Sequence, residues 1–384
     1  MITSFLFVSC DSDNDDNVIE VTAPATYEFL RDGVSTVSFS GQTTRLNQVD
    51  AIYNALNSKA DDGSGAQKFY TEAQIDAMFA DGAGFMDAAL NGTGKKVRSK
   101  TSAGCAAGNS ATQAQFDDQI ADFTANVVSA WSADASAGVA GKITYTSNPS
   151  KSIHVNKFGH EIDQTFVKGL IGGMCLDQIV NNYLQPCQLD SGTRRDDNTN
   201  GTLSSGKNYT DMEHKWDEAF GYLYGQEADY SRADLGSAPT GNGTTLNKYF
   251  KKINDSNMPG ISQTVYDAFK LGRAAIVAGA YEIRDAQANI IKVNLSKVIG
   301  YKSVDYLNGY MSKMAAGNTA DAFHALSEGY GFIMSLQFTN DGNDNPHFTK
   351  AEVDAMLAKL TDFWTVKDSD LTSMVSQIKS KMNI

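Results

Sequence analysis

The sequence predicts a mainly α-helical protein, built as one helical bundle or as two packed bundles, with a small β-hairpin near the N-terminus. Only 6 prolines occur in 384 residues, so long stretches are free of helix breakers. Further on, apolar residues recur at the spacing of one helix face: Leu46, Val49, Ile52, Tyr53 and Leu56. Capping-box patterns, with an acceptor three residues before Glu or Gln, predict helix starts at Thr71, Ser110, Thr210 and Thr349.

The expected elements follow in chain order. Short alternating runs at 27–30 and 34–39 flank Arg31-Asp32-Gly33, a turn sequence, and predict the hairpin. Helical periodicity starts at Leu46 and then predicts long helices near 111–133, 154–184, 210–230, 261–293, 303–315, 319–336, 350–362 and 368–382.

Two of these helices are rich in small residues. Their glycines are Gly169, Gly172 and Gly173 in one helix, and Gly272 and Gly279 in the other. Glycine inside a helix costs about 1 kcal/mol relative to alanine, so its presence needs a compensating gain. We interpret the stripes as places where two helices approach closely, in preference to space kept for a ligand.

The charge balance excludes some partners. With 32 Lys and Arg against 45 Asp and Glu, the net charge is -13, which disfavours nucleic acid and anionic lipid surfaces as partners. No apolar run approaches the roughly 18 residues that a membrane span needs. Contact with a membrane is therefore expected only through an attached lipid.

The N-terminus predicts such an anchor. Residues 1–9 resemble the end of a bacterial lipoprotein signal peptide, with Cys10 as the lipidated residue, although no Lys or Arg precedes the apolar stretch. Residues 10–24 form an acidic tether, and residues 25–384 form the helical domain. The expected location is the outer membrane, facing the cell surface or the periplasm. The alternative is an ordinary frayed terminus with a buried cysteine.

The remaining cysteines are odd in number: Cys105, Cys175 and Cys187. Cys175 and Cys187 are near enough in sequence to pair, whereas Cys105 lies in a Gly/Ala-rich loop. In an oxidising compartment one thiol would stay free, and the sequence leaves the pairing open.

Histidine and carboxylate residues at helical spacing are the first candidate site. Three of the 5 histidines have a carboxylate three or four residues later: His160 with Asp163, His214 with Glu218, and His324 with Glu328. Such pairs lie on one helix face, and helical bundles build metal sites from them. Imidazole with carboxylate suits iron, zinc or manganese. The alternative is that each pair forms a surface hydrogen bond or a satisfied core histidine.

A metallopeptidase is the enzymatic alternative, although an enzyme is not the favoured interpretation. His160-Glu161 begins the zinc-peptidase motif, but position 164 is Gln where that motif has its second histidine. Glu161 or Glu218 would then act as general base on a metal-bound water.

A second candidate is a calcium loop. Asp196, Asn198, Asn200 and Gly201 match its first, third, fifth and sixth positions, while Lys207 stands where a bidentate Glu is expected. The alternative is a plain Asx-rich turn.

Four segments resemble the bacterial lipoprotein family of domain of unknown function 4856. They are SGQTTRL at 40–46, residues 159–177 with KGLIG at 168–172, KWDEAFGY at 215–222, and HALSEG at 324–329. More distantly, the chain is similar to imelysin-like proteins, whose signature is Gly-x-His-x-x-Glu. Here His160 matches the histidine, Gly159 stands one residue too close, and Asp163 replaces the Glu. The resemblance implies paired helical bundles and a role in handling iron or haem.

The expected function is therefore that of an envelope lipoprotein that binds a transition metal for iron uptake. Its ligand would be a metal ion, an iron chelate or haem, and its partner an outer-membrane receptor. A structural or partner-binding lipoprotein without a metal is the remaining alternative.

Overall fold

The computed structural model describes residues 19–57, 68–105 and 109–384. These residues form thirteen α-helices and two small antiparallel β-hairpins, which confirms the mainly α fold. The predicted signal peptide, Cys10 and residues 10–18 of the predicted tether lie outside the described residues.

The helices are α1 (Ser40–Leu56), α2 (Glu72–Asp76), α3 (Ser110–Asp122), α4 (Ile162–Leu170), α5 (Pro186–Leu189), α6 (Arg194–Thr199), α7 (Asp211–Tyr224), α8 (Leu246–Asn254), α9 (Ile261–Ala278), α10 (Tyr281–Ala315), α11 (Thr319–Ser335), α12 (Lys350–Ala358) and α13 (Asp368–Met382). Wider π-turns form η1 (Ala77–Asp81), η4 (Phe123–Val127), η6 (Ile171–Leu176) and η7 (Ile179–Tyr183). Tighter 3-10 turns form η2 (Ala88–Leu90), η3 (Arg98–Lys100), η5 (Val128–Ala130) and η8 (Leu336–Phe338). The strands are β1 (Leu30–Arg31), β2 (Val34–Ser35), β3 (Gly141–Tyr145) and β4 (Asn148–Val155).

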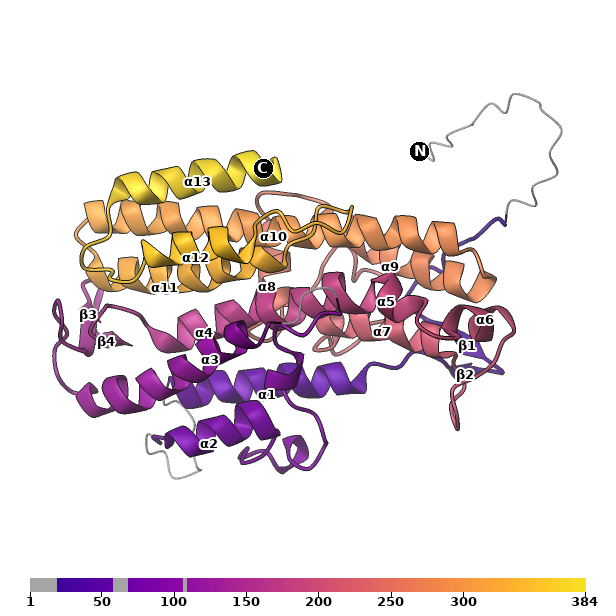
Figure 1. Ribbon diagram of the computed structural model, residues 1–384, viewed down its shortest axis with the longest axis horizontal. Coiled ribbons are helices and arrows are strands. Elements are labelled where there is room, and N and C mark those ends of the chain that lie inside the picture. Colours follow the sequence, from indigo (N-terminus) through magenta and orange to yellow (C-terminus); the bar gives the residue numbers. More distant parts are fainter. Residues whose placement is uncertain (1–18, 58–67, 106–108) are drawn as a thin grey trace.

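The long helices lie side by side along the long axis of the molecule (Figure 1). The central helix α10 packs against α9, α11 and α13, and α11 in turn packs against α4. On the other side of α4, α1 contacts both α4 and α7. The buried apolar side chains of these helices form one continuous core.

The glycine stripes lie where helices meet, as the sequence predicts. A Cβ at Gly172 would lie 2.2 Å from Cβ of Ser335, and one at Gly331 would lie 2.5 Å from Cβ of Lys168. At Gly272 the clash would be with the ring of Trp216, at 2.1 Å. The missing side chains therefore allow the α4–η6 segment to pack directly on α11, and α9 on α7.

The predicted helix starts are confirmed at three of four positions. Thr71, Thr210 and Thr349 form reciprocal capping boxes. Ser110 does not cap its helix, because Asn109 does so instead by accepting a hydrogen bond from the backbone N–H of Ala111.

Several predicted helices have wrong boundaries. The helix expected at 210–230, for example, ends at Tyr224. The helix expected at 154–184 begins only at Ile162, because residues up to Val155 form the strand β4, which pairs with β3. The helix expected at 261–293 ends at Ala278, since Gly279 adopts φ +71° and stops it. A single helix, α10, then covers the remainder together with the segment expected at 303–315.

The N-terminal hairpin is confirmed in a short form, with Leu30 opposite Ser35 and Arg31 opposite Val34. Asp32 and Gly33, both at positive φ, make its turn. Within the described part of the chain, no helix combines the length and hydropathy that crossing a membrane requires.

Candidate ligand-binding site

A cavity of about 520 Å³ is lined by residues of the β3–β4 hairpin, α1, α4 and α11. The hairpin lies at the left end of the bundle in Figure 1. The volume of the cavity falls within the range of small-molecule sites, roughly 300–1,000 Å³. The side chains that decide its chemistry are Tyr53, Phe123, Trp131, Tyr145, Lys151, His154, Glu161, Asp163, Gln164 and His324.

Aromatic rings form part of its wall. The indole of Trp131, in the turn after η5, stacks on the imidazole of His154 with 3.5 Å between ring centroids and 8° between planes. Tyr145 lines the cavity from β3 and Tyr53 lines it from α1. Burial is the main cause that lowers the pKa of His154, to about 4, so its imidazole is neutral at pH 7.

The turn between β4 and α4 fixes the first acidic group. Gly159 adopts φ +88° there, a conformation that favours glycine. Two residues later, the backbone N–H of Glu161 donates to the hydroxyl of Ser327 on α11, at 2.9 Å. The Glu161 carboxylate then lies 2.6 Å from Nδ1 of His324, also on α11.

The acidic neighbours of His324 keep its imidazole protonated. Burial opposes its protonation, but the charge and hydrogen bond of Glu161 outweigh this and raise the pKa of His324 to about 9. The imidazolium is therefore the main form at pH 7, and it donates from Nδ1 to Glu161. Its Nε2 lies 3.7 Å from Glu328.

A second charged pair lies behind this one. Nζ of Lys168 is 3.5 Å from Glu328, and the hydroxyl of Tyr249 donates to the same carboxylate at 3.0 Å. Burial works against the charge of Glu328, yet Lys168 and His324 prevail and lower its pKa. The opposite charges of Lys168 and Glu328 thus offset each other.

On another wall of the cavity, the side-chain amide of Gln164 bridges a carboxylate and a phenol. Nε2 of Gln164 donates both to Asp163 and to the hydroxyl of Tyr53, at 3.0 Å each. Burial and the nearby Asp163 raise the pKa of Tyr53 to about 12, so the phenol stays neutral.

The lining of the cavity carries as many cationic as anionic side chains. It includes the carboxylates of Glu161 and Asp163, the exposed Lys151 and protonated His324. Hydrogen-bonding groups and aromatic rings make up much of the remaining lining.

The family model described as Domain of unknown function (DUF4856) matches residues 24–384. The chain belongs to this family. No curated protein and no solved structure matches it. The DUF4856 match therefore identifies the family without supplying an activity.

The first predicted pair of this DUF4856 protein, His160 with Asp163, does not form. His160 precedes α4, so the two side chains are not related by helical spacing. Nε2 of His160 lies 3.0 Å from the carbonyl oxygen of Leu360, and its ring packs on Phe363. Burial lowers its pKa to about 4. His160 lines a separate cavity of about 330 Å³ instead.

The second pair, His214 with Glu218, lies elsewhere. Glu218 binds Lys215 at 2.6 Å and accepts from Gln42 at 3.0 Å, while Nδ1 of His214 lies 3.0 Å from the carbonyl of Ser38. Gln42 and the cavity residue Tyr53 are both on α1. Their eleven-residue separation corresponds to roughly 16 Å along the helix.

The third pair, His324 with Glu328, is the one that the structure brings to the cavity, with Asp163 nearby. Glu161, considered from the sequence only as a general base, is its direct partner. Among the described residues, no group of three or more His, Cys, Asp and Glu is arranged to hold a metal ion.

The segment expected to be a calcium loop is helical. Residues 194–199 form α6, and the amide of Asn198 donates to the carbonyl of Ile276 at 2.8 Å and accepts from Thr210 at 2.6 Å. Asn200 ends the helix. Asp196 and Asn198 are therefore placed by helix geometry and packing, not by a loop that wraps an ion.

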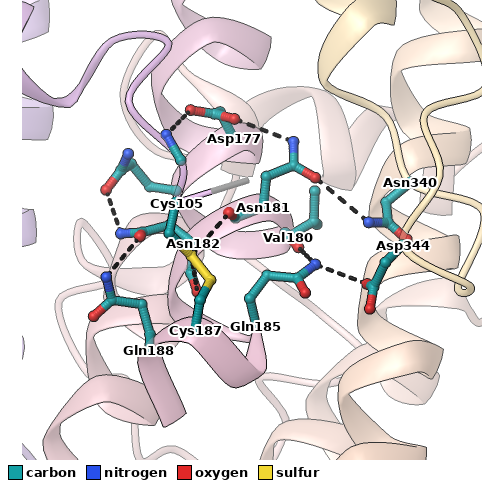
Figure 2. The surroundings of a disulfide bond; sticks show 12 residues. Cys105, Asp177, Val180, Asn181, Asn182, Gln185, Cys187, Gln188, Asn340 and Asp344 are labelled. Atoms are coloured by element: carbon teal, nitrogen blue, oxygen red, sulfur yellow. Dashed lines mark hydrogen bonds between the residues drawn. A yellow bond between two sulfur atoms is a disulfide. The ribbon is translucent and has the colours of Figure 1, made fainter. Parts of the chain in front are cut away.

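The disulfide is not the Cys175–Cys187 pair that nearness in sequence would allow. Cys105 is bonded to Cys187 on α5 (Figure 2). Cys175 is the free thiol among the described cysteines. Cys175 faces the core from η6, where burial raises its pKa to about 12. Asp177 anchors the Cys105 loop as well, by accepting from the backbone N–H groups of Ala103 and Gly104.

The aromatic wall was not foreseen from the sequence. Trp131 stacks on His154 of the strand β4, whereas the sequence predicts a helix that begins at residue 154. The alternation of buried Ile153 and Val155 with less buried neighbours is the signal that predicts a strand there.

Proposed function

We propose that the protein binds a neutral, hydroxyl-rich solute, of the saccharide class, in the cavity between the β3–β4 hairpin and α4. The observation that carries the proposal is the cavity itself, about 520 Å³ with aromatic walls and as many cationic as anionic side chains in its lining. A sugar ring has apolar C–H faces that pack on an indole or phenol, and hydroxyls that donate to carboxylates and amides.

The charge balance favours a neutral ligand over an ionic one. A cationic amine would meet the imidazolium of His324 and the ammonium of Lys151, while an anion would meet Glu161 and Asp163. A hydroxyl, in contrast, can donate to a carboxylate such as Asp163 without bringing an uncompensated charge into the cavity.

A glycan microarray with neutral, acidic and amino sugars tests the proposal. Wild-type protein is expected to bind neutral glycans, and Asp163→Asn is expected to weaken that binding at least tenfold, since one charged acceptor is lost. Asp118→Asn is the matched control, because this exposed carboxylate borders the separate cavity beside His160. Binding to charged sugars alone, or to no glycan, would contradict the proposal.

Transition-metal binding is a second candidate at the same place. It is favoured by one observation, that His324 lies 2.6 Å from Glu161 and 3.7 Å from Glu328. The three groups would have to rearrange around the ion and the imidazolium would have to lose its proton, because as they stand they are not arranged as a metal site. Elemental analysis after incubation with iron, zinc or manganese tests it. A stoichiometric metal that is lost in His324→Ala and kept in His160→Ala and His214→Ala would support this candidate, and an unloaded wild-type protein would contradict it.

We also infer that the protein works in an oxidising compartment, in line with the expected envelope lipoprotein. The support is the Cys105–Cys187 disulfide, a bond that persists outside reducing compartments. Metabolic labelling with a fatty acid tests the anchor: label that disappears in Cys10→Ala is the expected result, and an unlabelled wild-type chain would contradict it.

A further inference from the structure

Trp131 borders a second hollow besides the cavity already described. This hollow, of about 420 Å³, is lined by Phe69 and by residues 128–133. Trp131 lines both spaces, so they adjoin at this residue.

The second hollow carries an exposed aromatic ring of its own. Phe69 is 41% exposed, and its ring meets that of Trp131 edge to face, with 5.1 Å between centroids and 78° between planes. A phenylalanine held in this way offers a flat apolar surface next to the indole. Such a surface can pack against the apolar C–H face of a sugar ring.

Hydroxyl groups accompany the rings. Ser129 and Ser132 line the second hollow, and both residues are exposed. The hydroxyl of Ser129 donates to the carbonyl oxygen of Ala125 at 2.9 Å, so its oxygen keeps lone pairs for an incoming donor. The second hollow thus combines an aromatic surface with hydrogen-bonding groups, as the first cavity does.

We infer that the protein binds an oligosaccharide chain, with one sugar unit in the first cavity and the following unit over Phe69 in the second hollow. This inference rests on the proposed function. We choose an oligosaccharide as the ligand because the two spaces adjoin at Trp131 and have similar linings. Each unit of a chain of linked sugar rings offers the same combination of apolar faces and hydroxyls.

Calorimetric titration with mono- to hexasaccharides of β-1,4-glucose, α-1,4-glucose and β-1,4-mannose tests the inference. Affinity is expected to rise at least tenfold between the mono- and the tetrasaccharide of a series that binds. Phe69→Ala is expected to remove that gain and to leave the affinity for the monosaccharide unchanged. Phe158→Ala, which truncates another exposed phenylalanine beside the separate cavity, is the matched control and should keep the gain.

A blocking variant gives an independent result. Ser129→Trp places a large ring in the second hollow from an exposed position and should exclude the longer chains while monosaccharide binding persists. Equal affinity for mono- and tetrasaccharide, unaffected by either variant, would overturn the inference and leave the proposed function standing. Binding of no saccharide would overturn both.

Discussion

At the scale of single residues, the pairing of His324 with Glu161 determines the charge of the cavity. The two side chains come from segments 163 residues apart, so no local spacing could indicate their 2.6 Å contact. The sequence did single out His324 and Glu328, because helical spacing within one helix is visible in it. It missed the actual partner, since that depends on how α4 packs on α11.

This pairing predicts a specific titration. Because the pKa of His324 is raised to about 9 from an ordinary 6.5, the protonated pair stabilises the fold fully below pH 6.5. That contribution should be lost as the pH rises through about 9. Imidazole NMR of wild-type protein should show His324 titrating near pH 9, and Glu161→Gln should lower that pKa.

Glu218→Gln serves as control, because Glu218 lies beside His214 and Lys215 and not beside His324. It should leave the titration of His324 unchanged. A wild-type His324 that titrates near its ordinary value would refute the ion pair.

At the scale of elements, the contact between η6 and α11 depends on Gly172. A Cβ there would lie 2.2 Å from Cβ of Ser335, so Gly172→Ala should force the two segments apart. Overpacking of this kind typically costs about 1–3 kcal/mol, and denaturant unfolding should show a loss of that size. Because Glu161 directly precedes α4 and His324 lies on α11, ligand affinity should fall as well.

Gly309→Ala in α10 is the matched control. Its new Cβ would lie 3.9 Å from Cβ of Ala325, an ordinary contact, and alanine is the better helix former. We expect unchanged or slightly raised stability. A Gly172→Ala protein as stable as this control would contradict the close approach.

The elements also show what a sequence can predict. Capping boxes at Thr71, Thr210 and Thr349 were correct because each involves only four neighbouring residues. The β3–β4 hairpin was missed because a strongly apolar helix follows β4, and the periodicity of that helix extended the expected helix back to residue 154. This error concealed the wall of the candidate site.

At the scale of the whole molecule, the disulfide joins parts of the chain 82 residues apart. Closing a loop of that length restricts the unfolded chain, and the expected stabilisation is roughly 4 kcal/mol. Cys105→Ser and Cys187→Ser should each lower the free energy of unfolding by about that amount, and adding a reductant should do the same to the wild type. Reduction should have little further effect on either variant.

Peptide mapping under non-reducing conditions checks the pairing. A peptide linking Cys105 to Cys187, with Cys175 alkylated only after unfolding, is expected. A link between Cys175 and Cys187 would contradict the structure. The sequence left this pairing open, because spacing along the chain does not show that Cys175 faces the core.

The whole molecule is thus a helical bundle with a partly aromatic cavity beside its β3–β4 hairpin. The fold class was predictable from periodicity, whereas the site was not, because its walls come from α1, α4, α11 and the hairpin together.

The most direct test of the account is a crystal structure of the protein grown with the glycan that it binds most tightly. We predict a sugar ring packed on Trp131, with a hydroxyl within hydrogen-bonding distance of Asp163. A glycan bound on another surface, with none in this cavity, would contradict the central claim.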